Sequence, residues 1–271
     1  VILRDFDARA VAEMIAAERI TGIWLAPVMT SAILALDLDG LPDMSSLRWC
    51  IGGGDRTPEG RIREFGRYFP NACYLDAYGM TETVSGDTLM EPGMEIAKLG
   101  SVGRPVALVE LEVRDEHGAS LPNGAVGEIC MRGTKVSQGY WKDPSRTADA
   151  HHPDGFMRSG DMGYMDEDGF LFLTDRQKDM IISGGENVAS SEVERVIHLL
   201  PQVLEVAVVA RPDPKWGEVP VAVVVLRPGA SLGFEALVSH CRAHLAGFKC
   251  PKALRLLDRL PRNPSGKVLK R

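Results

Sequence analysis

The alternation of short apolar runs with helical segments in the first hundred residues is the feature that most constrains the fold. Apolar runs that end at Pro27 and just before the glycines 52–54 have the length and composition of buried strands. Segments 7–19, 30–36 and 58–68 show the spacing or the flanking residues of helices. Strands that alternate with helices predict a mostly parallel, layered α/β sheet.

The pattern changes in the second hundred residues. Short strand-like runs separated by turn sequences predict a β-rich subdomain over about 100–176. Strands and helices mix again after a charged stretch, which predicts a small α+β unit. The predicted domains are therefore 1–176, which is α/β to about residue 99 and β-rich beyond it, and 177–271.

Composition excludes several classes of protein. The 271 residues are 45% hydrophobic and 25% charged, as in ordinary globular proteins, and the net charge of −6 argues against binding to nucleic acid through bulk charge. Five cysteines, an odd number without a C-x-x-C spacing, predict reduced thiols in a cytoplasmic protein. No apolar run approaches the roughly 18–20 residues of a membrane span.

The motif at residues 76–82, which reads Asp-Ala-Tyr-Gly-Met-Thr-Glu, follows a strand-like segment. Strand ends are where α/β proteins bind ligands. An aromatic ring there could stack on a base, a hydroxyl could contact a phosphate, and a carboxylate could hold Mg²⁺. The alternative is a buried tyrosine followed by a capping threonine.

Three further motifs each have a structural alternative. Asp161 follows a Gly turn and could hold two ribose hydroxyls, but aspartate is also common in turns. Residues 175–187 combine a charged stretch with paired glycines, as in a linker next to a ligand-binding turn or in a solvated loop. Residues 261–267 present Lys267 in a loop restricted by Pro and Gly, or form a plain basic tail.

The order and spacing of these four motifs resemble those of the adenylate-forming (AMP-binding) superfamily, from about residue 21 to 271. Further pieces that resemble the family are 52–54, 100–105, 127–129 and 139–141, and the overall texture is closest to bacterial fatty-acyl-CoA synthetases. The resemblance implies the remnant of a large layered α/β domain with a β-rich subdomain, and a small α+β C-terminal domain joined by a hinge.

The resemblance also implies a role for each motif residue. Lys267 would bridge the acyl carboxylate and the α-phosphate, Thr81 would contact that phosphate, and Glu82 would bind Mg²⁺. Asp161 and Arg176 would hold the ribose, with Tyr78 on the adenine and Lys178 at the hinge. The remaining nucleotide-binding positions would be Gly53, Gly54, Asp55, Asp76 and Gly79, and those near CoA would be Ser183, Gly184, Gly185, Trp216 and Lys249.

The family's Ser/Thr/Gly-rich phosphate loop is absent from this sequence, as is the first large part of the N-terminal domain. The expected activity is an acyl-CoA ligase that uses ATP, Mg²⁺ and CoA on a fatty or other apolar carboxylic acid. Two alternatives remain: a non-catalytic, truncated nucleotide-binding remnant, and an adenylation domain that loads a carrier protein. A sheet without its N-terminal half would pair either as a homodimer or with that missing part.

Overall fold

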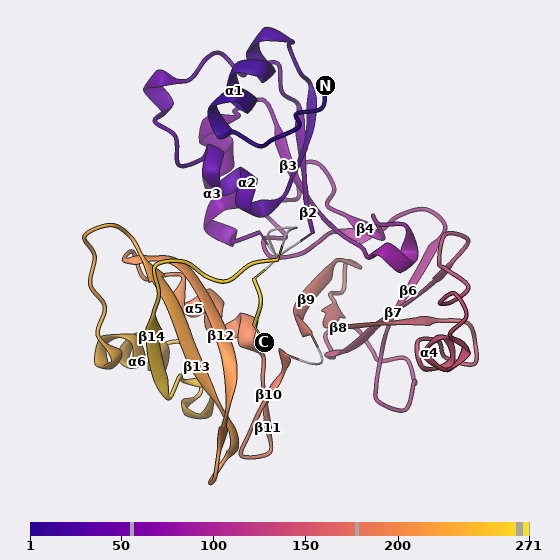
Figure 1. The fold of residues 1–271 in the computed structure, drawn as a ribbon. Coiled ribbons are helices and arrows are strands. Elements are labelled where there is room, and N and C mark those ends of the chain that lie inside the picture. Colours follow the sequence, from indigo (N-terminus) through magenta and orange to yellow (C-terminus); the bar gives the residue numbers. More distant parts are fainter. Residues whose placement is uncertain (55–56, 177–178, 264–267, 271) are drawn as a thin grey trace. The chain divides into compact units, whose positions relative to one another are not determined.

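The computed structural model describes residues 1–54, 57–176, 179–263 and 268–270, with only the backbone for residues 175 and 176 (Figure 1). The chain divides into two compact units. The first consists of Val1–Ser159 and Gly163–Leu173, and the second of Gly160–Met162 and Thr174–Arg271. The predicted domain boundary near residues 176–178 falls largely on residues outside this description and stays a prediction.

A five-stranded sheet organises the start of the first unit. Its strands, in spatial order, are β1 (Gly22–Leu25), β2 (Trp49–Gly53), β3 (Cys73–Tyr78), β4 (Thr88–Leu89) and β5 (Arg104–Pro105). The first three are parallel, and β4 and β5 join in antiparallel fashion. Helices α1 (Ala8–Ala17), α2 (Pro27–Ile33) and α3 (Glu59–Tyr68) connect or precede the parallel strands. The predicted parallel α/β architecture is confirmed.

Local sequence explains these helices. Asp7 begins α1, because its side chain accepts a hydrogen bond from the Ala10 backbone N–H. Pro27 occupies the first turn of α2, where no backbone donor is needed, so this helix starts earlier than the predicted residue 30. The apolar face of α1 joins Phe65 of α3 in one buried core around the parallel strands.

A four-stranded sheet forms the β-rich region, in the order β6 (Val109–Arg114), β7 (Gly127–Gly133), β8 (Met157–Met165) and β9 (Leu171–Arg176). Helix α4 (Pro144–Asp149) lies between β7 and β8 in the sequence. The segment before β5 is tied to Leu171 of β9: Val102 donates to the Leu171 carbonyl at 2.9 Å, and Leu171 donates to the Gly103 carbonyl at 2.8 Å. These hydrogen bonds join the two sheets within the first unit.

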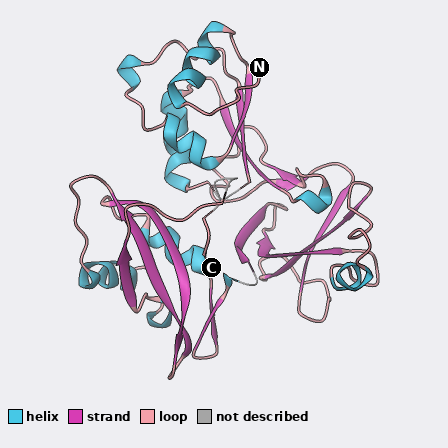
Figure 2. Ribbon diagram, in the orientation of Figure 1, coloured by secondary structure: helices cyan, strands magenta, loops and turns pink. Residues whose placement is uncertain are grey.

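The second unit contains a sheet ordered β11 (Glu186–Val188), β10 (Ile181–Ser183), β13 (Gly217–Leu226) and β12 (Val203–Asp213), with β14 (Ala253–Leu256) parallel to β13. Helices α5 (Ser190–Ile197) and α6 (Phe234–Arg242) share its apolar core. Figure 2 shows the helices in cyan and the strands in magenta. This mixture of helices and strands is the predicted α+β unit.

All four tryptophans of the chain face solvent. The exposed fraction is 57% for Trp24, 42% for Trp49, 88% for Trp141 and 45% for Trp216. Trp24 and Trp49 lie on neighbouring strands, β1 and β2. None of the described helices is long and apolar enough to cross a membrane.

Candidate active site

The carboxyl ends of β2 and β3 bring two of the predicted motifs to the same edge of the parallel sheet. Gly52 pairs with Asp76, and Gly53 with Ala77, so Gly53 and Gly54 lie beside the beginning of the 76–82 motif. Gly54 has a φ of 92°, a conformation that favours glycine because other residues are strained there. Asp55, predicted to line the same pocket, lies outside the described residues.

Asp76 is buried at 4% exposure, and its side chain belongs to an internal polar network. The Thr57 hydroxyl lies 3.0 Å from the Tyr74 hydroxyl and donates to Asp76 Oδ1 at 3.4 Å. Burial, reinforced by the Asp76 charge, raises the pKa of the nearby Cys50 thiol to about 12. Asp76 therefore has a structural role, as the acceptor for Thr57, and its contact with a nucleotide stays a prediction.

Tyr78 ends β3 and is also buried, with 8% of its surface exposed. It packs in an apolar cluster with Val102, Ile129 and Leu171, residues of the β-rich region and of its connection. This is the environment of the alternative interpretation, a buried tyrosine. Stacking of its ring on adenine stays a prediction.

Thr81 and Glu82 lie in a single 3₁₀ turn, Thr81–Thr83, within the loop that joins β3 to β4. Thr81 is exposed and Glu82 half-buried. The Tyr140 hydroxyl donates to Glu82 Oε1 at 2.9 Å, and the Ser137 backbone N–H donates to the Glu82 carbonyl at 2.7 Å. The hydrogen bond to this carboxylate raises the pKa of the Tyr140 hydroxyl, because deprotonation would place two anions together.

The surroundings of Glu82 fit a divalent cation. No ion pair to Glu82 is formed by any residue that the structure describes, so no lysine or arginine there neutralises this partly exposed carboxylate. Carboxylate oxygens are the hard ligands that Mg²⁺ prefers, and Mg²⁺ sites with one or two carboxylates are completed by phosphates and water. Glu82 is therefore the residue of this turn that could hold Mg²⁺.

Sequence reasoning missed Tyr140 and Lys135 as partners of this turn. Tyr140 belongs to a family-like piece, residues 139–141, so its motif was visible although its contact with Glu82 was not. Lys135 had no such signal: its ammonium reaches back to residues 85–87, about fifty positions earlier in the chain.

The second unit brings together the glycine turn and the tryptophan that were expected near CoA. Gly184 links β10 and β11 with a φ of 63°, and its backbone N–H donates to the Trp216 carbonyl at 2.8 Å. A side chain at Gly184 would come within 2.8 Å of the Trp216 ring, so only glycine fits beneath this indole. Ser183 is buried at the end of β10, and Gly185, with a φ of 86°, completes the turn.

Lys249 has a partner that the sequence did not indicate. Its ammonium lies 2.7 Å and 2.9 Å from the two carboxylate oxygens of Glu192 on α5. This ion pair holds the short 3₁₀ turn Gly247–Lys249 against the helix. A contact of Lys249 with CoA stays a prediction.

The mutual arrangement of the remaining predicted residues stays a prediction. Asp161 lies on β8, in the stretch that belongs to the second unit. Arg176 ends β9, and its side chain is not described. Lys178 and Lys267 lie outside the described residues. On either side of Lys267 in the sequence, Arg262 pairs with Glu205 at 2.8 Å and Lys270 with Glu194 at 2.7 Å.

A group of metal-ligating types occurs in the β-rich region but already has a structural role. Ligand atoms of Glu128, Cys130 and His152 lie within 4.8 Å of one another. Arg158 neutralises the Glu128 carboxylate at 2.9 Å, and burial raises the pKa of the Cys130 thiol to about 12. A protonated thiol beside a paired carboxylate is a core contact rather than a prepared cation site.

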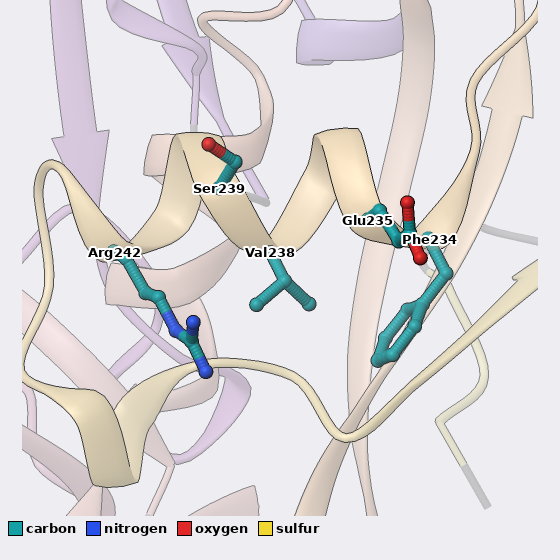
Figure 3. Close-up of a pocket in the computed structure, with 5 residues that line it drawn as sticks. All are labelled: Phe234, Glu235, Val238, Ser239 and Arg242. Atoms are coloured by element: carbon teal, nitrogen blue, oxygen red, sulfur yellow. The ribbon is translucent and has the colours of Figure 1, made fainter.

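A cavity of about 270 Å³ lies along α6 in the second unit. Figure 3 shows Phe234, Val238 and Arg242 pointing from this helix toward the neighbouring loop, with Glu235 and Ser239 beside them. No predicted site residue within the described part of the chain lines it. The cavity is therefore not the candidate active site.

Family models match both parts of the chain. Residues 1–141 match the AMP-binding enzyme model, and residues 192–267 match the model of the AMP-binding enzyme C-terminal domain. The chain belongs to the AMP-binding enzyme family. The resemblance inferred from the sequence motifs is thereby confirmed.

Known members of the AMP-binding family resemble this chain along almost its whole length. A feruloyl-CoA synthase from an Amycolatopsis species is 39% identical, over 98% of this chain and 53% of that protein. Among solved structures, the amide bond synthetase McbA from Marinactinospora thermotolerans has a TM-score of 0.92 and 37% identity, covering 99% of this chain and 54% of that one. The O-succinylbenzoate coenzyme A synthetase MenE from Bacillus subtilis, in complex with ATP and magnesium ion, has a TM-score of 0.86 and 34% identity, covering 98% and 54%. The chain thus spans about half the length of the relatives it matches.

Proposed function

We propose that the protein containing this chain is an ATP-dependent, AMP-forming acid–thiol ligase. It activates a carboxylic acid as an acyl-adenylate and transfers the acyl group to CoA, releasing AMP. The observation that carries this proposal is the Thr81–Thr83 turn at the edge of the parallel sheet, where an exposed hydroxyl and the Glu82 carboxylate lie together. The likeness to a CoA synthetase solved with ATP and magnesium ion supports it.

The chain's own residues have defined tasks in such a reaction. Thr81 donates a hydrogen bond to the α-phosphate, and Tyr140 holds Glu82 in one orientation. Bound Mg²⁺ would offset the negative charge of the phosphates that the acid's carboxylate must approach. Lys267, on the proposal, stabilises the charge of the transition state of adenylation and is not needed for thiol attack.

The acid is proposed to be fatty or otherwise apolar. The stretches expected to line its pocket, residues 24–30, 51–55 and 77–85, contain few charged side chains. The similarity to a feruloyl-CoA synthase supports an apolar acid with a ring as one member of this class. Pairing of the chain as a homodimer, or with a preceding N-terminal part, also remains a proposal.

The test incubates the protein with Mg²⁺, ATP, CoA and either ferulate or a fatty acid, and quantifies AMP and acyl-CoA by mass spectrometry. We expect equimolar AMP and thioester from at least one acid. Formation of adenylate and AMP without thioester, together with acylation of a carrier protein or an amine, would show a different acceptor. Absence of adenylate with every acid would favour the non-catalytic alternative.

Nucleotide binding is tested separately with Asp161. Asp161→Ala should weaken AMP binding about tenfold or more in calorimetry, because each of two lost hydroxyl contacts contributes on the order of 1 kcal/mol. Asp168→Ala is a matched control, since that aspartate is exposed and pairs with Lys98. Equal AMP affinity in both variants would refute the assignment of Asp161 to the ribose.

A further inference from the structure

The loop that carries Thr81 and Glu82 continues into an unusual left-handed segment. Val84, Ser85 and Gly86 have consecutive φ values of 59°, 62° and 64°. This region is strained for a β-branched residue, and Val84 is 75% exposed, so packing of its own side chain does not compensate. Contacts elsewhere must therefore hold the loop in this shape.

Asp87 and Lys135 supply those contacts. Asp87 is completely buried, and its carboxylate accepts a hydrogen bond from the Thr83 hydroxyl and lies 2.9 Å from the Lys135 ammonium. The same ammonium donates to the carbonyls of Ser85 at 2.7 Å and Gly86 at 2.9 Å. The Lys135 ammonium thus contacts three oxygens, the carbonyls of Ser85 and Gly86 and one carboxylate oxygen of Asp87.

The same stretch of chain also contacts the other end of the turn. Two and five residues after Lys135, the Ser137 backbone and the Tyr140 hydroxyl bind Glu82. Residues 135–140 therefore contact the loop on both sides of Thr83. Removing the Lys135 charge leaves the Asp87 carboxylate buried and uncompensated, which is far more disruptive than losing an exposed ion pair. Removing the Asp87 charge takes from Lys135 the buried carboxylate that holds its ammonium against the loop.

We propose that Asp87 and Lys135 are positioning residues that fix the Thr81–Glu82 turn for Mg²⁺ and the nucleotide phosphates. Neither side chain needs to touch the ligand. The effect on Glu82 passes through Thr83, whose hydroxyl donates to Asp87 and accepts a hydrogen bond from the Met80 backbone N–H at 3.3 Å, at the start of the turn. We call the contacts of Asp87 and Lys135 with the loop the clamp. The role of the clamp in ligand binding rests on the proposed function, whereas its existence rests on these contacts alone.

The test uses Asp87→Asn and Lys135→Met in the protein that contains this chain, with Lys98→Met as control. Lys98 is a similarly half-buried lysine of the first unit, and its ion-pair partners, Asp166 at 2.7 Å and Asp168, lie outside the loop. Hydrogen–deuterium exchange is measured without ligand. The backbone amides of Thr83, Val84 and Ser85, which now bond to loop carbonyls, should exchange at least tenfold faster in the first two variants only.

The second readout is the Mg²⁺ concentration needed for half-maximal ATP binding or adenylation. It should rise about 10- to 100-fold in Asp87→Asn and Lys135→Met, as when a metal ligand loses its supporting partner, while the KM for CoA is unchanged. Unchanged exchange would refute the clamp. Faster exchange with unchanged Mg²⁺ dependence would refute the positioning role. A wild-type protein that binds no Mg²⁺–ATP would refute the proposed function, and the exchange measurement would still show whether the clamp exists.

Discussion

Replacing Gly79 by alanine tests how closely the loop after β3 folds back on itself. A methyl group at Gly79 would lie 2.4 Å from the Gly86 backbone nitrogen, 2.9 Å from the Ser85 carbonyl carbon and 3.0 Å from Asp87 Oδ2. Two of these atoms are backbone, and the third belongs to a buried ion pair, so none can move aside easily. Overpacking of this kind costs about 1–3 kcal/mol.

Gly66→Ala provides the matched control. Gly66 lies inside α3, and a methyl group there would meet no atom within 4 Å. Alanine should stabilise this helix by about 0.5–1 kcal/mol relative to glycine. Because both substitutions change the unfolded chain in the same way, that effect cancels between them, and the difference in stability of the two variants, about 1–3 kcal/mol, isolates the native-state clash.

The assay is urea unfolding of both variants and the wild type, monitored by circular dichroism. The m value, the slope of the unfolding free energy against urea concentration, is compared to detect loss of cooperativity. Gly79→Ala should unfold at lower urea than the wild type and Gly66→Ala at higher urea. If Gly79→Ala matched Gly66→Ala, the close approach of residues 85–87 to β3 would be refuted, and with it the shape of the Thr81–Glu82 turn.

Three further predictions concern single residues. Lys267→Ala should lower adenylate formation roughly 10²–10³-fold and spare thioester formation from supplied acyl-adenylate; equal losses in the two steps would contradict the assigned role. Lys178→Pro, which restricts φ at the predicted hinge, should preserve adenylation better than thioester formation, and wild-type rates for both would show that the hinge is elsewhere. Iodoacetamide at pH 8 should label Cys73 before Cys50 and Cys130, because burial raises the pKa of the latter thiols to about 12; peptide mass spectrometry before and after denaturation gives the order.

Hydrophobic periodicity and turn residues were sufficient to predict the layers of this fold. They did not predict which side chains contact one another within the candidate site. The parallel strands β1 and β2 follow from the short apolar runs that end at Pro27 and before the glycines 52–54, because such runs have few other ways to be buried. The Tyr140–Glu82 and Lys249–Glu192 contacts each join residues more than fifty positions apart. Only the folded chain brings such pairs together, and one sequence carries no local signal of them.

Burial explains the other differences. The 76–82 motif was identified by side-chain chemistry, yet Asp76 and Tyr78 are both buried and pack or hydrogen-bond within the protein. Tyr78 is buried by residues of the β-rich region and its connection, and Asp76 is bound by Thr57, so both environments form only when the chain folds. Thr81 and Glu82 follow the strand, in the loop, and for that reason remain accessible.

The four solvent-facing tryptophans determine what the intrinsic fluorescence of this protein can measure in solution. The four residues are already 42–88% exposed, so the red shift of intrinsic fluorescence on unfolding should be smaller than for buried tryptophans. The same exposure makes the four rings accessible to a neutral quencher such as acrylamide in the native state. A molecule or chain segment that covers Trp24 and Trp49 on the sheet, or Trp216 above Gly184, would therefore protect that ring from quenching.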